Sequence, residues 1–130
     1  MKLTHLNPDT LHRNPAFSQG IAVEGTARTI YVGGQNGTGA DGNLVGSDLG
    51  AQTEQALKNV LEVLKAAGAS QKDVVKMTIY LAKDQDANAG FAASQKVWGM
   101  HPTTISVLMI ERPARPGALV EIEVVAAVGA

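Results

Sequence analysis

The segment from Leu49 to Ala67 constrains the fold of this chain more than any other part of its sequence. Apolar residues recur there at intervals of three and four, which is the period of one face of an α-helix. That face comprises Leu49, Thr53, Ala56, Leu57, Val60, Leu61, Leu64 and Ala67. Ser47 or Asp48 is the expected N-cap, and Gly68 is the expected stop. Such a helix has one apolar face to bury, so the sequence predicts a helix that covers a sheet.

Extended segments surround this helix. Runs of apolar and β-branched residues between turn signals predict six strands. The expected ranges are 2–6, 19–24, 28–35, 73–81, 103–110 and 119–126. Ser70 and Asp73 form the pattern of a capping box for a short turn. Two glycines, Gly33 and Gly34, stand inside the third strand, which indicates either a bulge or a group that must approach the backbone closely.

A second helix is expected from Ala87 to Trp98, weakened by Gly90. Its expected inward positions are Phe91, Ser94, Gln95, Val97 and Trp98. The resulting order is β-β-β-α-β-α-β-β, which predicts one α+β domain over residues 1–130 with both helices on one face of a mixed sheet. No third helix remains for the other face. Self-association through that open face is the expected remedy.

The last strand, 119–126, carries two carboxylates among apolar residues. Val120 and Ile122 belong to the expected helix-covered face, whereas Glu121 and Glu123 belong to the open face. If the open face packs against a neighbouring subunit, a carboxylate there needs a partner or a ligand. The alternative is an ordinary solvated glutamate at the rim of an interface, and the alternation by itself fits both.

Composition excludes several functional classes. The formal charge is −1 and there is no basic block, which argues against nucleic acid as a partner. No apolar run approaches the ~20 residues that span a bilayer, and the first residues lack the pattern of a signal peptide. The chain has no cysteine, and its histidines (His5, His12 and His101) lack metal-ligand spacing, so no metal is expected. The absence of cysteine fits a reducing compartment, and we expect a cytoplasmic protein.

Four stretches taken together resemble one known family. They are YVGGQ at 31–35, DLGAQTEQALKNVLEVLKAAGAS at 48–70, DVVKMTIYL at 73–81 and LVEIEVVA at 119–126. In this order they are similar to the reactive-intermediate deaminase family (Rid, YjgF-like), formerly called L-PSP endoribonuclease. The resemblance implies a chorismate-mutase-like fold and a homotrimer with three clefts between subunits. It also implies hydrolysis of small imines or enamines to release ammonia, without a metal or cofactor.

The resemblance also implies a set of cleft residues. Phe17 matches the family's cleft aromatic residue, which is often a tyrosine. Gly34 matches the backbone glycine of the GQ motif, and Gln95 matches an asparagine of the second helix. Glu121 matches the glutamate that, together with backbone groups, places the attacking water. That residue is the expected catalytic group.

One family residue is missing from the chain. Thr104 stands where active relatives carry the arginine that grips a substrate carboxylate with two hydrogen bonds. Losing such a contact costs ~2–4 kcal/mol, which argues against 2-imino-acid deaminase activity. We expect Arg112 and Arg115 to be solvated turn residues rather than substitutes.

Thr104 and Ser106 share one strand face, and we expect Glu121 on the matching face of the neighbouring strand. The expected cleft is polar without a fixed cation. It would favour a neutral or cationic small molecule over an amino-acid carboxylate. The sequence therefore predicts a hydrolase for an imine, enamine or related C–N compound. The alternative is a non-catalytic ligand-binding or sensing trimer, and RNA cleavage ranks last.

Overall fold

The computed structural model describes residues 1–130, and every predicted element is present in it. The strands are β1 (Lys2–Leu6), β2 (Gly20–Glu24), β3 (Ala27–Gln35), β4 (Val74–Ala82), β5 (Thr104–Ile110) and β6 (Val120–Gly129); the helices are α1 (Leu49–Ala66) and α2 (Ala87–Val97). A short 3₁₀ turn, Gln71–Asp73, precedes β4. The bounds lie within one or two residues of the predicted ones, except that β6 runs three residues further.

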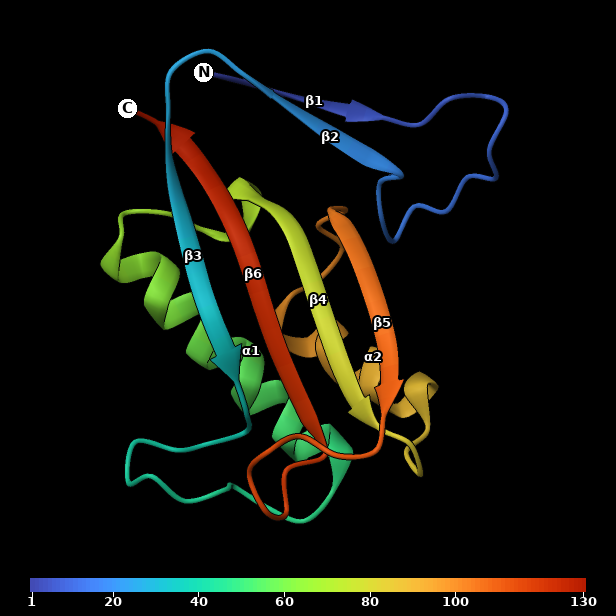
Figure 1. Cartoon of the computed structure of the whole chain (residues 1–130), viewed down its shortest axis with the longest axis vertical. Coiled ribbons are helices and arrows are strands. Elements are labelled where there is room, and N and C mark those ends of the chain that lie inside the picture. Colours follow the sequence, from blue (N-terminus) through green and yellow to red (C-terminus); the bar gives the residue numbers. More distant parts are fainter.

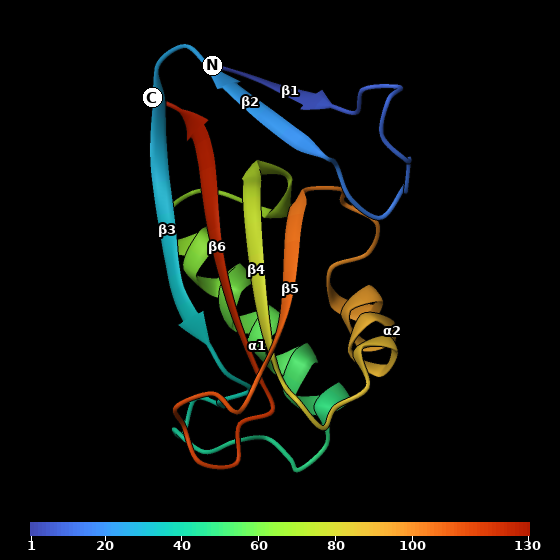
Figure 2. The same cartoon turned by 45° about the vertical axis from the view of Figure 1, so that its right-hand side comes forward.

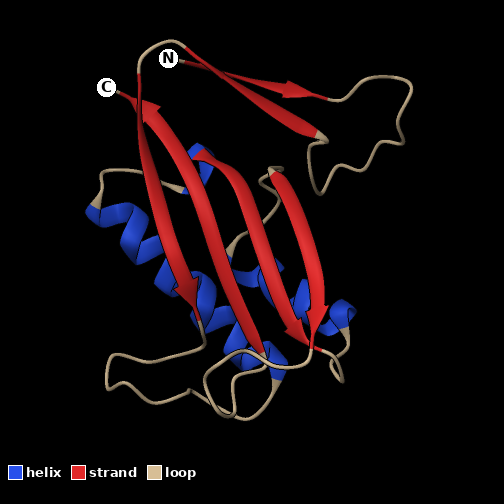
Figure 3. Ribbon diagram, in the orientation of Figure 1, coloured by secondary structure: helices blue, strands red, loops and turns tan.

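Four strands form the main sheet, in the order β3-β6-β4-β5. β4 and β5 are parallel, and β6 is antiparallel to both of its neighbours. β1 and β2 form a separate antiparallel pair beyond one end of this sheet (Figure 1). Both helices lie behind the main sheet, and no element covers its front (Figure 3). The α+β prediction with two helices on one face is confirmed.

Alternation along β6 separates the two faces of the sheet. Val120, Ile122, Val124 and Ala126 are each at most 2% exposed and belong to the core beneath α1. Glu121 and Glu123 between them are half-buried on the open face. The predicted division of this strand is therefore confirmed. A residue's face follows from its place in the period-two pattern of a strand.

The predicted helix ends are also confirmed. The Asp48 side chain accepts a hydrogen bond from the Ala51 backbone N–H at 2.8 Å, which caps α1. Gly68 follows the helix with a φ of +73°, a conformation that side chains other than glycine rarely adopt. Ser70 and Asp73 make the predicted capping box.

The orientation of α2 differs from the prediction. Phe91, expected to point inward, is 53% exposed, whereas Gly90 and Ala93 are buried. A Cβ atom at Gly90 would lie 3.4 Å from Leu49 Cδ2, which is an ordinary van der Waals distance, so α2 packs on α1 at this position. Gly90 therefore marks a helix–helix contact rather than a simple interruption. Among the other predicted inward positions, Trp98 is buried.

Gln52 is a buried polar residue in the stripe of α1, and sequence reasoning missed it. Its amide nitrogen donates to the carbonyl oxygens of Gly46 and Gly117, at 2.9 and 3.1 Å. Its amide oxygen accepts from the Leu119 backbone N–H at 2.8 Å. One fully buried side chain thus joins α1 to two loops and to the start of β6. Gln52 lies four residues before Ala56, about one helical turn away on the same face, and this spacing could have predicted its burial.

Neither helix is long and apolar enough to cross a membrane. No group of three or more histidine, aspartate or glutamate side chains could hold a metal ion.

Candidate functional site

Glu121 lies against the backbone of β3, beside Gly34. The pairing of β3 with β6 is irregular between Val32 and Gln35, so the predicted bulge is present. A Cβ atom at Gly34 would clash with Glu121 Oε2 and lie 2.7 Å from its Cδ atom. Both explanations of the glycine pair therefore hold: the strand bulges, and a carboxylate approaches the backbone. At Gly33 a Cβ atom would meet nothing within 4 Å.

The two carboxylates of β6 have different partners. The Tyr80 hydroxyl donates to Glu123 Oε1 at 2.8 Å. This hydrogen bond, followed by burial and by the negative charges of Glu123 and Glu121, raises the pKa of Tyr80. Glu121 Oε1 accepts from the Asn36 amide at 3.3 Å, while its Oε2 atom has no hydrogen-bond partner. Glu123 Oε2 likewise has no hydrogen-bond partner, but the single hydrogen bond of Glu121 is longer than that of Glu123, so the Glu121 carboxylate is the less firmly held of the two.

A second polar cluster lies where β5 begins. The Thr104 hydroxyl donates to the Val75 carbonyl oxygen, and Ser106 Oγ accepts from Lys76 Nζ at 2.8 Å. The Ser18 backbone N–H donates to the Thr103 carbonyl oxygen at 2.9 Å, which holds the neighbouring Phe17 near the start of β5. Phe17 and Pro102 line one polar hollow.

Lys76 corrects the prediction of a cleft without a cation. Its ammonium group lies beside the predicted Ser106, and Lys76 pairs directly with Thr104 across β4 and β5. The ammonium group of Lys76 is therefore one cation of this cluster, and Arg13, which lines the hollow with Phe17, is a second. A lysine presents a point charge rather than the planar fork of an arginine.

The clusters around Glu121 and Thr104 are separate within one protomer. In the register of the sheet, Thr104 of β5 pairs with Lys76 of β4, which in turn pairs with Val125 of β6. Glu121 of β6 pairs instead with Tyr80 of β4. The four-residue offset and the intervening strand β4 put their backbones ~16 Å apart. They share the open face, as predicted, but the expectation that they lie on neighbouring strands is wrong. One protomer does not bring them together.

Gln95 lies on the other side of the sheet. It is half-buried on α2 and lines a hollow that also contains Ile105 and Val107. The alternation of β5 directs these two residues to the helix side and Thr104 and Ser106 to the open side. Gln95 therefore does not join Glu121 or Thr104 within the protomer.

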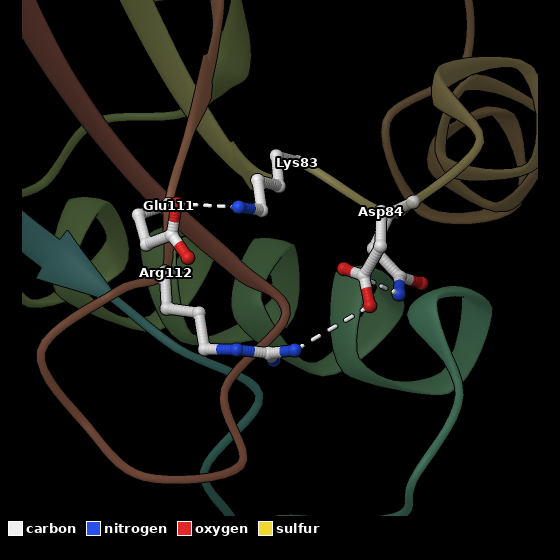
Figure 4. Close-up of polar contacts among 5 residues, drawn as sticks. Lys83, Asp84, Glu111 and Arg112 are labelled. Carbon is white, nitrogen blue, oxygen red and sulfur yellow. Dashed lines mark hydrogen bonds and ion pairs between the residues drawn. The ribbon is translucent and has the colours of Figure 1, made fainter.

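The two turn arginines have different roles. Arg112 is exposed and lies 3.4 Å from Asp84, beside an ion pair between Lys83 and Glu111 (Figure 4). The expectation of a solvated arginine is confirmed for this residue. It is wrong for Arg115, which is half-buried and donates to Thr38 Oγ1 at 3.0 Å and to the Gly42 carbonyl oxygen at 2.6 Å. Neither arginine has a hydrogen bond to Glu121 or Thr104.

Two asparagines near Glu121 were not anticipated. Asn36 contacts Glu121 and also donates to the Val120 carbonyl oxygen at 3.1 Å. Asn59 of α1 donates to the carbonyl oxygens of Asn36 and Thr38, at 3.2 and 2.9 Å, and so holds this loop in place. The sequence signals were an amide directly after the GGQ strand end and an asparagine directly before Val60 of the apolar stripe of α1.

Comparison with known proteins identifies the class that this fold defines. The family model described as endoribonuclease L-PSP matches residues 9–128. The Rid-family protein YyfB from Yersinia pestis has a solved structure that superposes with a TM-score of 0.85 at 34% identity, covering 98% of this chain and 100% of that one. The chain therefore belongs to the endoribonuclease L-PSP family, also called the Rid or YjgF-like family, as the sequence motifs predicted.

Curated relatives include deaminases. The bovine 2-iminobutanoate/2-iminopropanoate deaminase is 36% identical over 115 residues, which are 87% of this chain and 80% of that protein. The human protein of the same name is 44% identical over 73 residues, which are 55% of this chain. That match spans about half of the human protein, 51% of its length.

Proposed function

We propose that this protein binds a small molecule in clefts between the protomers of a homotrimer and hydrolyses a C=N bond there. The observation that carries the proposal is the separation of two polar clusters on one uncovered sheet face. The cluster of Glu121 and Gly34 lies towards one end, and that of Thr104 and Phe17 towards the other. A head-to-tail contact would bring one cluster of each protomer to the other cluster of the next. Such contacts form a ring when the rotation between neighbouring protomers closes.

Glu121 is the proposed general base. Its free carboxylate oxygen takes a proton from water while the water oxygen bonds to the imine carbon. Glu121 returns this proton to the nitrogen, which gives a neutral carbinolamine. The nitrogen then takes the hydroxyl proton while the C–N bond breaks and the C=O bond forms, and it leaves as ammonia. The sum is R₂C=NH + H₂O → R₂C=O + NH₃, so atoms and charges balance without a cofactor. A positioned base of this kind contributes roughly 10²–10⁴-fold to the rate.

The substrate class follows from the cluster at Thr104. Lys76 offers one point charge there, and the Thr104 hydroxyl is engaged by the Val75 carbonyl oxygen. Neither group reproduces the two parallel hydrogen bonds of an arginine on a carboxylate, and Arg13, which lines the hollow with Phe17, has no hydrogen bond to Thr104 or Ser106. We therefore propose an uncharged imine or enamine as the preferred substrate, with 2-imino acids as weaker ones. The cytoplasm remains the predicted location.

A non-catalytic ligand-binding trimer is the second candidate. It is favoured by the hydrogen bond of the Thr104 hydroxyl to the Val75 carbonyl oxygen, because a hydroxyl that is already engaged contributes little to a reacting substrate. The two candidates differ in a turnover assay. An imine can be generated in situ by an oxidase and trapped with semicarbazide; a hydrolase diverts it to the carbonyl product and ammonia, whereas a binding protein leaves the trapped fraction unchanged.

Thr104→Arg is expected to raise hydrolysis of 2-imino acids roughly 30- to 100-fold, because it adds a charge-assisted grip on the carboxylate. The measurement compares semicarbazide trapping for an imine with a carboxylate and for one without. Thr104→Met, which adds length without charge, should give no such gain. A gain that is equal for both imines would contradict the assigned role of position 104. If the wild type and Thr104→Arg are both inactive on both imines, the protein is not a hydrolase of this kind.

Gly34→Ala is expected to lower turnover of the uncharged imine ~10- to 100-fold, since the added methyl group must displace the Glu121 carboxylate. Gly33→Ala is the matched control, because its added Cβ meets open space and the same bulge tolerates it. Rates and thermal midpoints are measured for both variants. Equal rates for the two alanine variants would show that the position of Glu121 is unimportant.

A further inference from the structure

A hollow of about 130 Å³ lies between α2 and the helix side of β4 and β5. Most of its lining is apolar, including Leu57, Met77, Ile79, Leu81, Ile105 and Val107. Phe91 also lines it, and Phe91 and Val107 are 53% and 52% exposed, so the hollow opens to solvent. It lies on the opposite face of the sheet from Glu121 and is independent of the proposed function.

The hollow exists because the buried positions of α2 carry small residues. The buried residues within α2 are Gly90 and Ala93, and Ser94 is another small residue of the lining. Figure 2 shows α2 standing to the side of β5, whereas α1 lies behind the other strands. Ile79 and Ile105 remain only half-buried as a result. In a close-packed core, these two positions would be covered.

Two buried polar atoms in the lining residues lack partners. They are the hydroxyl oxygen of Thr53 and the indole nitrogen of Trp98. These residues are 4% and 6% exposed, and both line the hollow. A buried donor without a partner is unfavourable, and such groups in native proteins call for a ligand or a water.

We propose that this hollow is a binding site for a small uncharged molecule with an apolar ring or branched body and one hydrogen-bond acceptor. An apolar cavity of about 150 Å³ accepts benzene, so a body of roughly six heavy atoms fits. The acceptor would accept a hydrogen bond from Trp98 Nε1, with the Thr53 hydroxyl as a second partner; both atoms are covered in the ligand-free hollow, so binding would include a small shift of the indole ring. His101 is the sole ionisable residue of the lining, which favours an uncharged ligand.

The test uses tetrahydropyran and cyclohexane, which have the same size and differ by one ether oxygen. Trp98 is the sole tryptophan of the chain, so its indole N–H gives one resonance that reports on the site. Saturable binding of tetrahydropyran should shift this resonance. Trp98→Phe should weaken tetrahydropyran binding roughly 3- to 10-fold more than cyclohexane binding in a ligand-observed NMR titration. It removes the donor, which only tetrahydropyran uses, as well as part of the ring, which both probes contact.

A matched pair of variants locates the site. Ser94→Leu places a larger side chain in the hollow and should abolish binding of both probes, whereas Ala92→Leu adds the same bulk on the exposed side of α2 and should leave binding unchanged. An unshifted indole resonance at the solubility limit of both probes would overturn the proposal. So would equal loss of affinity for both probes in Trp98→Phe. If Ser94→Leu does not fold, the wild-type resonance alone decides.

Discussion

Glu121→Gln is expected to lower hydrolysis of an uncharged imine by at least ~100-fold while the fold is retained. Glutamine has the size of glutamate and still offers an oxygen to the Asn36 amide, so the local geometry is kept. It cannot accept a proton from water, which removes the base catalysis that typically contributes roughly 10²–10⁴-fold. The measurement is the rate of ammonia release at saturating imine, together with the affinity for the carbonyl product.

Glu123→Gln is the matched control for this experiment. It lies two residues away on the same face of β6, and its oxygen is already engaged by the Tyr80 hydroxyl. Glutamine can accept the same hydrogen bond, so turnover should stay within a factor of ~3. Loss of turnover in Glu123→Gln together with full activity in Glu121→Gln would reverse the roles assigned to the two carboxylates.

Gln52→Ala is expected to destabilise the protein by about 3 kcal/mol or more. The substitution leaves one buried N–H, of Leu119, and two carbonyl oxygens, of Gly46 and Gly117, without this partner, and it also opens a cavity. Unfolding by guanidinium chloride at a fixed protomer concentration measures the change, because subunit association contributes to apparent stability.

Lys58→Ala is the control for Gln52→Ala, since Lys58 is an exposed residue of the same helix. Its effect should stay within ~0.5 kcal/mol. A loss below about 1 kcal/mol in Gln52→Ala would mean that water replaces the three hydrogen bonds. In that case the side chain would not be what joins α1 to the loops beside Glu121.

The periodic elements could be predicted from the sequence. The stripe of α1 and the alternation of β6 follow from neighbours along the chain, so each pattern reveals its own buried face. That is why Glu121 was assigned to the open face and Val120 to the core. The family motifs, which lie in these same periodic segments, placed the chain in its family.

Tertiary structure decided which residues meet. β4 inserts between β5 and β6, which separates Thr104 from Glu121, and Lys76 of β4 then lies beside Ser106. Likewise Arg115 joins a distant loop, and Gln52 joins three segments. Strand order and buried hydrogen bonds depend on pairings between residues far apart in sequence, which local periodicity does not encode. For the same reason the hollow beside α2 is visible only in the folded chain.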